Sequence, residues 1–333
     1  MQDSPIPCPS LRQAALLRRY GPPEAIRVET QLLPPRKPGL VPVQVLAAAV
    51  TVGDARIRAA RAPGGLGPML RLAFGLTGPR QPVLGMFFCG RLIEPAPGLA
   101  AGSRVMGNTG MAMGAHATHL QIDPARLRPA PESLGEAEAA ALMFGGLTAA
   151  DFLLDKAALR PGQSLLVNGA TGEVGCAALQ IARHLGLVST AICRTENHEF
   201  ARGLGASACH DYRQGPPQGR WDGILDLAGT LPYARSKALL APGGVLMPAT
   251  ASLGAMLGGA LRPRRGTHRI TASTTDDGPK ALDRLLDLHR QGAIRPVVSA
   301  PLSLDQIAQA HALCDSGHKR GSVVVVMAAD DRP

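Results

Sequence analysis

A glycine-rich segment, GATGEVG, carries the clearest chemistry in this sequence. It follows an apolar stretch, SLLVN, and precedes VGCAALQIARHLG, whose apolar residues fall on one helical face and which Gly186 is placed to end. A strand, a tight turn and a helix in this order bring backbone N–H groups and the positive end of a helix against phosphate oxygens. Ala170, Gly172 and Gly175 occupy the small-residue positions of such a turn.

The segment therefore predicts a pyrophosphate site of a bound dinucleotide, and the alternative is a purely structural glycine-rich turn. The residues predicted to form the cradle are Gly169, Ala170, Thr171, Gly172, Glu173, Val174 and Gly175.

The next predicted strand, LVSTAIC, ends in Arg194 and Thr195. A NAD site expects an acidic residue here, about 20 residues beyond the turn, to accept both ribose hydroxyls. A cation in its place favours a 2′-phosphate, so the sequence predicts NADP, used as NADPH. The alternative is that Arg194 is one of many solvated arginines.

The elements around this cradle indicate an α/β protein of more than one domain. Residues 1–133 contain short apolar segments cut by Gly and Pro, which is typical of a β-rich domain. Residues 134–275 alternate apolar strands with amphipathic helices, which predicts a parallel sheet. Residues 276–333 contain two helical stretches and then an apolar strand, GSVVVVM.

The basic character of the chain does not indicate nucleic-acid binding. The net charge is +10, but only five of the 35 basic residues are lysines, and the arginines are scattered. The one dense run, Leu261 to Arg269, lacks aromatic residues for base stacking, so we expect a solvated loop there.

Other features favour a cytoplasmic protein. The six cysteines are widely spaced and show no metal-ligand spacing, which predicts reduced thiols and no metal site. The uncharged stretch Ala238 to Leu261 contains Pro242 and Pro248, so we expect a buried strand with loops rather than a membrane helix. The N-terminus shows no secretory signal.

The chain resembles the quinone oxidoreductase branch of the medium-chain dehydrogenase/reductases over nearly its whole length after residue 10. The matching stretches are RRYGPPEAIRVE, VLAAAVTVGDARIR, PVLGMFFCGRLIE, the segment GLTAADFLLDKAALRPGQSLLVNGATGEVGCAALQIARHLG, and LSLDQIAQAHALCDSGHKRGSVVV. The resemblance implies a GroES-like β-rich catalytic domain (residues 1–133), a Rossmann doubly wound parallel-sheet domain that binds NADP (134–275), and a C-terminal return to the catalytic domain (276–333).

The resemblance also bears on metal binding. Where zinc-dependent members carry their ligands, this chain has Thr51, Met86 with Phe87, and about Met143. Without zinc no Lewis acid polarises an alcohol, so the expected reaction is zinc-free hydride transfer from NADPH to a quinone or an α,β-unsaturated carbonyl. A redox-neutral or non-catalytic nucleotide-binding member of the fold, used for sensing, scaffolding or tailoring, is the alternative.

Further contacts are implied by the same resemblance. Thr148 is expected beside the nicotinamide carboxamide, Tyr212 near the adenosine phosphate, and Ala228 with Gly229 beside the cofactor ribose, although each residue could equally serve packing. A small-molecule substrate and a homodimer are the expected partners.

Few residues offer themselves for the chemistry. Thr51 can donate one hydrogen bond but is a poor acid, so we expect the proton to come from water. Asp54 matches an acid that recurs in the family, and its alternative role is to close a loop. His116 or His119 is a candidate proton donor, or else a packing residue. The basic, apolar segment Arg56 to Arg80 is expected to border the substrate entrance and to attract an anionic or amphipathic substrate, or else to be an ordinary surface loop.

Overall fold

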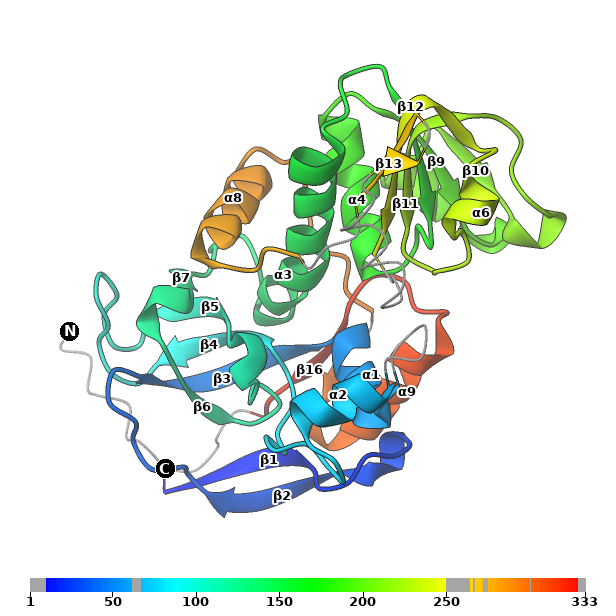
Figure 1. Cartoon of the computed structure of the whole chain (residues 1–333). Coiled ribbons are helices and arrows are strands. Elements are labelled where there is room, and N and C mark those ends of the chain that lie inside the picture. The colour runs from blue at the N-terminus through cyan, green and yellow to red at the C-terminus, as the bar shows by residue number, and fades with distance from the viewer. Residues whose placement is uncertain are drawn as a thin grey trace.

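Two seven-stranded sheets and the helix α3 (Glu136–Ala150) organise the molecule. The structure is a computed structural model that describes residues 10–61, 67–249, 264–265, 267–271, 275–299 and 301–328. In Figure 1, α3 lies between the sheet that contains β3 and the sheet that contains β9 and β11. A separate hairpin of β1 (Leu11–Leu17) and β2 (Ile26–Leu32) lies beneath the first of these sheets.

The second sheet has the strand order of a doubly wound dinucleotide-binding domain. The order is β10-β9-β8-β11-β12-β14-β13, and every neighbouring pair except β13 with β14 is parallel. The strands are β8 (Ser164–Asn168), β9 (Val188–Ile192), β10 (Ala208–His210), β11 (Trp221–Asp226), β12 (Leu240–Pro248), β13 (Arg264–Arg265) and β14 (His268–Ile270). The order reverses between β8 and β11, and ligands of such sheets bind at this switch point.

The first sheet is built from both ends of the chain. Its order is β15-β16-β3-β4-β5-β7, with β6 also pairing with β3. The strands are β3 (Val41–Val50), β4 (Phe87–Leu92), β5 (Arg104–Asn108), β6 (His119–Ile122), β7 (Leu127–Pro129), β15 (Leu302–Ser303) and β16 (Val323–Val326). Because β16 pairs antiparallel with β3, the chain returns to this sheet after the Rossmann domain.

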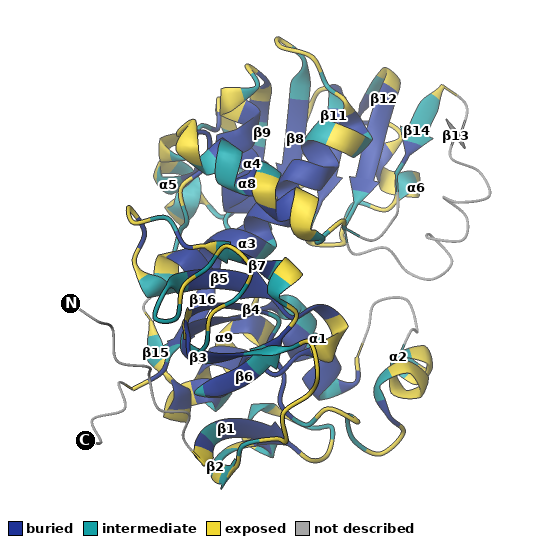
Figure 2. Cartoon of the chain, turned by 90° about the vertical axis from the view of Figure 1, so that its left-hand side faces the viewer, coloured by how far each residue is buried: buried dark blue, intermediate teal, exposed yellow. Residues whose placement is uncertain are grey.

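Helix α3 and its continuation join the two sheets in one core. The π-helix Asp151–Ala157 extends α3, and the combined helix is the one segment of the described chain that is long and apolar enough to cross a membrane. It contacts β3, β4, α4 (Glu173–His184) and α8 (Pro279–Arg290), and 78% of its most apolar 18-residue stretch is buried inside the protein. Packing against both sheets accounts for its apolar composition (Figure 2).

Two expectations about irregular segments need correction or limits. The basic run is not simply a loop, because Arg264–Arg265 and His268–Ile270 form β13, the edge strand of the sheet, and β14, with which it pairs antiparallel. The apolar stretch after Ala238 does contain a strand, β12, but residues 250–263 lie outside the described residues.

Candidate functional site

The glycine-rich turn lies between β8 and α4, as the sequence predicts, and its geometry explains the residue types. Gly169 has φ +84°, a left-handed conformation that side chains rarely adopt. A Cβ on Gly175 would lie 2.4 Å from the Gly169 carbonyl oxygen, so only glycine lets α4 start so close to the turn. At Gly172 the nearest atom to a Cβ is 3.6 Å away, so there is open space beside this position, although Gly172 itself does not line the cleft described below. The turn therefore fits a pyrophosphate.

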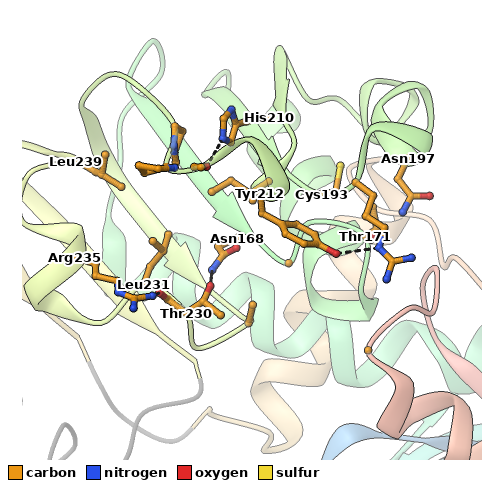
Figure 3. A pocket seen from close by; sticks show the side chains of 18 of the residues that line it. Asn168, Thr171, Cys193, Asn197, His210, Tyr212, Thr230, Leu231, Arg235 and Leu239 are labelled. Carbon is orange, nitrogen blue, oxygen red and sulfur yellow. Dashed lines mark hydrogen bonds between the residues drawn. The ribbon is translucent and has the colours of Figure 1, made fainter.

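A cleft of about 890 Å³ lies at the carboxyl ends of the parallel strands (Figure 3). We call it the Rossmann cleft. Among the predicted cofactor residues, those that line it are Gly169, Thr171, Arg194, Tyr212 and Ala228. The cleft has further lining residues that no sequence motif indicates, among them Asn168, Asn197, His210, Thr230, Arg235, Ser316, Gly317 and His318. Asn168 and His210 end strands of the parallel sheet and Asn197 and Thr230 follow such strands, so position is their sequence signal, whereas Ser316 to His318 lie at the end of α9 and have no such signal.

The switch point is fixed by hydrogen bonds between the ends of β8 and β11. The Asn168 side-chain amide donates to Asp226 Oδ1 (2.7 Å) and to Thr230 Oγ1 (2.8 Å). Asp226 also accepts from the Gly229 and Leu231 N–H groups (both 2.9 Å). The loop after β11 is thereby held in place, and it presents Ala228 to the cleft while Gly229 takes φ +74° behind it.

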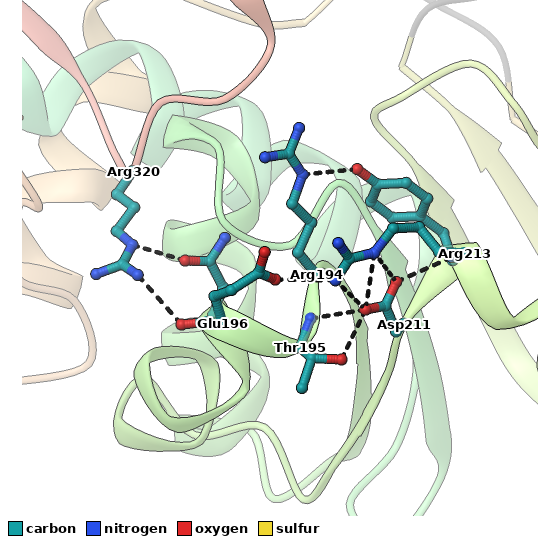
Figure 4. Close-up of polar contacts among 8 residues, drawn as sticks. Arg194, Thr195, Glu196, Asp211, Arg213 and Arg320 are labelled. Carbon is teal, nitrogen blue, oxygen red and sulfur yellow. Dashed lines mark hydrogen bonds and ion pairs between the residues drawn. The ribbon is translucent and has the colours of Figure 1, made fainter.

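Arg194 reaches the Rossmann cleft from the end of β9. Its Nε donates to Tyr212 Oη (2.9 Å), which positions the guanidinium (Figure 4). Its two terminal nitrogens have no hydrogen-bond partner among the described residues, so these nitrogens are available to an anion. The nearest acid in sequence, Glu196, accepts instead from Arg213 (3.0 Å).

Thr195 lies behind this position rather than in the cleft. Its N–H (2.8 Å) and hydroxyl (2.6 Å) both donate to Asp211 Oδ2, and Arg213 also donates to that carboxylate. The Arg213 guanidinium and the Thr195 hydroxyl hold the pKa of Asp211 well below its usual range. Thr195 therefore helps to order the loop that carries Arg194, together with Asp211 (Figure 4).

A segment of the C-terminal return, Lys319 to Ser322, contacts both the glycine-rich turn and the loop after β9. The Gly321 N–H donates to the Thr171 carbonyl (2.9 Å), so this segment lies directly against the glycine-rich turn. Arg320 donates to Asn197 Oδ1 (2.7 Å) and to the Glu196 carbonyl (3.2 Å) in the loop after β9 (Figure 4). These contacts join residues more than 120 apart in the sequence, so no local pattern reveals them.

Glu173 faces this segment and not the Rossmann cleft. Its carboxylate is ion-paired with Lys319 (2.8 Å), and both side chains are at most 10% exposed. Burial raises the pKa of Glu173, and the Lys319 ammonium opposes that rise. In a cofactor site Glu173 and Val174 can thus contribute only backbone N–H groups and the helix end, while the Glu173 side chain joins the Rossmann domain to the C-terminal return.

The predicted catalytic residues Thr51 and Asp54 are bonded to each other. Thr51 is the N-cap of α1 (Val52–Ala59): its hydroxyl donates to Asp54 Oδ2 (2.7 Å) and accepts from the Asp54 N–H (3.2 Å). Asp54 also accepts from the N–H groups of Thr51 (2.8 Å) and Gly85 (3.0 Å). Both side chains are buried, so the geometry supports a structural role for them, and their catalytic role stays a prediction. The spacing T-x-x-D was the available signal of this capping box.

The remaining candidates also lie away from the Rossmann cleft. Thr148 is buried on α3 and is not among the lining residues. His116 is fully buried, with Nε2 3.0 Å from the Ala49 carbonyl oxygen and its ring against His311. His119 is also buried, 3.1 Å from Thr118 Oγ1. Burial supports a packing role for His116 and His119, and their role as proton donors stays a prediction.

The positions that match zinc ligands in relatives hold apolar or capping residues. Phe87 and Met143 are buried, and Met86 is partly buried against the core. Within the described ranges, no three His, Cys, Asp or Glu side chains gather in a way that could hold a metal ion.

Comparisons with known proteins agree with this architecture. Residues 204–325 match the family described as zinc-binding dehydrogenase. The chloroplast envelope quinone oxidoreductase homolog of Arabidopsis thaliana is 28% identical over 214 residues, which are 59% of this chain and 63% of that protein. The spectinabilin polyketide synthase system protein NorB of Streptomyces orinoci is 30% identical over 86% of this chain, which spans 14% of that protein. The structure of the quinone oxidoreductase from Coxiella burnetii superimposes with a TM-score of 0.81 at 24% identity, over 95% of this chain and 99% of that one.

The fold is a two-domain dinucleotide-binding fold. Its parallel sheet has a reversed strand order with a glycine-rich turn at the switch point, and the C-terminal part of the chain completes its β-rich domain. The chain belongs to the medium-chain dehydrogenase/reductase superfamily, in its quinone oxidoreductase-like branch. It spans less than two thirds of the curated relatives that it matches first.

Proposed function

We propose that this protein is an NADPH-dependent, zinc-free reductase of quinones or α,β-unsaturated carbonyl compounds. The observation that carries the choice of NADPH is Arg194, a guanidinium at the end of β9 that lines the Rossmann cleft and has two nitrogens without a partner in the described structure. An arginine there binds a 2′-phosphate bidentately and offers nothing to the two ribose hydroxyls that an acid would accept from NAD.

The chain's own residues bind and orient, and they leave the electron transfer to the cofactor. When bound, NADPH would supply the hydride that, together with one proton, reduces a quinone to the hydroquinone or a conjugated C=C bond to C–C. When a dinucleotide is bound, the N–H groups of residues 171–174 and the start of α4 would hold its pyrophosphate, Arg194 would hold the 2′-phosphate, and the loop at Ala228 would support the ribose.

We assign the proton to solvent. Thr51 already donates its hydroxyl proton to Asp54, and His116 is buried behind the Ala49 carbonyl. Neither side chain lines the Rossmann cleft. The same observation favours the competing function, a nucleotide-binding protein without reductase activity, as the second candidate.

Arg194→Ala tests the cofactor assignment. Loss of a charge-assisted hydrogen-bonded pair should weaken NADPH binding by about 10- to 100-fold and leave NADH binding within about twofold, measured by isothermal titration. Arg160→Gln, at an exposed site outside the cleft, is the control for net charge. Equal losses for both nucleotides would refute the assignment.

Turnover separates the two candidate functions. We expect steady NADPH oxidation with at least one acceptor in a panel of quinones and enones, while tight NADPH binding without turnover on any acceptor would favour the non-catalytic function. A homodimer, a cytoplasmic location and the absence of nucleic-acid or membrane partners stay predictions.

A further inference from the structure

A second cleft, of about 790 Å³, lies in the catalytic domain where α1, α9 (Ile307–Ser316) and the turn Pro23–Ala25 pack together. We call it the arginine cleft. Helix α2 (Gly67–Phe74), which carries Arg71, lies on the same side of the molecule as α1 (Figures 1 and 2). The residues that line the cleft are Tyr20, Gly21, Pro22, Pro23, Val52, Ala55, Arg56, Arg58, Ala59, Ala60, Arg61, Arg71, Cys314 and Asp315. They include four arginines and one acid.

The single acid is already committed. Asp315 is ion-paired with Arg58 (2.5 Å), whose side chain is 2% exposed and which also donates to the Gly21 carbonyl (2.6 Å). Arg58 Nε is buried and has no hydrogen-bond partner in the described structure. One buried guanidinium therefore keeps an unsatisfied N–H group beside the cleft even after its ion pair has formed.

Arg56 also lines the cleft, and its side chain has no hydrogen bond or ion pair in the part of the chain that the structure describes. It is partly buried, and burial lowers its pKa with no opposing contribution from an acid. A partly buried cation without a counter-charge is unfavourable, and an anion that enters the cleft relieves this cost.

The other two arginines add positive charge at the same cleft. Arg71 lies over the Tyr20 ring, 5.1 Å from its centroid, and donates to the Leu76 carbonyl (3.0 Å). Arg61 is exposed and has no side-chain partner among the described residues. The field in this cleft therefore favours a negative ligand.

The rest of the lining is apolar. Val52, Ala55 and Ala59 lie on the same face of α1 as Arg56, at helical spacing, opposite Pro22 and Pro23. An apolar wall with convergent guanidinium groups fits a molecule with an apolar body and one oxyanion.

The cleft also lies next to the Rossmann cleft. Cys314 and Asp315 line the arginine cleft, and the next three residues, Ser316 to His318, line the Rossmann cleft. From this juxtaposition, we infer that the arginine cleft binds the acidic group of the substrate, and that the substrate is a quinone or enone whose apolar body carries a carboxylate, sulfonate or phosphate held by Arg56. The substrate class rests on the proposed reductase function, whereas the anion site does not.

Matched acceptors test the substrate class. With NADPH, the wild-type protein should show a lower KM for 1,2-naphthoquinone-4-sulfonate than for 1,2-naphthoquinone. Arg56→Gln should raise the KM for the sulfonate by about tenfold and leave kcat, and the KM for the neutral quinone, within about twofold. Arg160→Gln, with the same loss of charge outside both clefts, should behave as wild type. Equal changes for both quinones, or no preference in the wild type, would overturn the inference.

A binding measurement without turnover tests the anion site by itself. Isothermal titration should show 2-naphthalenesulfonate binding to the wild type about tenfold more tightly than the neutral naphthalene-2-sulfonamide, and Arg56→Gln should abolish this difference. If this difference is seen but no quinone or enone is reduced, the anion site stands and the reductase function fails. If the two ligands bind equally to the wild type, the site itself is refuted.

Discussion

The Rossmann cleft and the arginine cleft, which share residues 314–318 as a wall, differ in how their arginines are held. At the Rossmann cleft, Tyr212 positions Arg194, and Asp211 pairs with the neighbouring Arg213. At the arginine cleft, Arg56 has no such partner within the described residues. A hydrogen bond from a neighbouring side chain fixes the direction of a guanidinium before a ligand arrives, whereas a guanidinium without a partner leaves all of its hydrogen-bonding groups to the ligand. Arg194 is therefore oriented before its ligand binds, whereas Arg56 depends on its ligand for a partner.

The largest expected effect comes from breaking the ion pair that fixes the segment next to both clefts. Lys319→Met leaves the Glu173 carboxylate buried without its partner, which should lower the free energy of unfolding by about 3–5 kcal/mol in urea titrations. Glu173→Gln combined with Lys319→Met is the control, because it removes both charges and should recover much of the loss. If the single variant is as stable as wild type, the pair does not hold the C-terminal return to the cradle.

An intermediate effect is expected at the glycine-rich turn, where Gly172→Val should change the affinity for NADPH without changing the stability of the fold. The backbone at Gly172 is extended (φ −72°, ψ 172°) and a Cβ meets nothing closer than 3.6 Å, so the thermal stability should hardly change. The side chain would fill the approach to the phosphates and weaken NADPH binding by more than about tenfold, or more than about 1.4 kcal/mol.

The binding of 2-naphthalenesulfonate should not change in the Gly172→Val variant, because this residue is not part of the arginine cleft. Unchanged NADPH affinity would remove the foundation of the cofactor assignment.

The smallest effect concerns Asp211 and depends on pH. Because its pKa is lowered in the folded protein by Arg213 and Thr195, the carboxylate contributes stability above its unfolded pKa of about 3.9, and this contribution is lost as the pH falls below about 4. The difference in unfolding free energy between wild type and Asp211→Asn should therefore be largest at neutral pH and shrink towards pH 3. A difference that stays constant with pH would show that the carboxylate's charge is not involved.

Much of the parallel domain could be predicted because its signals are local. The periodicity around GATGEVG predicted β8 and α4, and Gly186, with φ +69°, follows the end of that helix as expected. The position after β9 predicted that Arg194 would stand at the site. In each case a strand, a helix or a turn is specified by neighbours within a few residues.

The predictions for the catalytic domain were weaker, for two physical reasons. Thr51 and Asp54 were proposed for chemistry, although their spacing is also that of a helix cap, and only the structure shows that their hydrogen-bonding groups are used in this way. The pairing of Glu173 with Lys319 joins residues 146 positions apart, so it depends on tertiary packing and leaves no periodic trace. Whether Arg56 has a counter-charge is likewise a property of the folded surroundings.

The short stretch from Cys314 to His318 forms part of the wall of both clefts. Any displacement of that wall by one occupant alters the space offered to the other. Since the free energy of a doubly liganded protein does not depend on the order of loading, the factor by which the nucleotide changes the anion's dissociation constant must equal the factor by which the anion changes the nucleotide's. A single stretch of five residues can in this way make two neighbouring binding events interdependent.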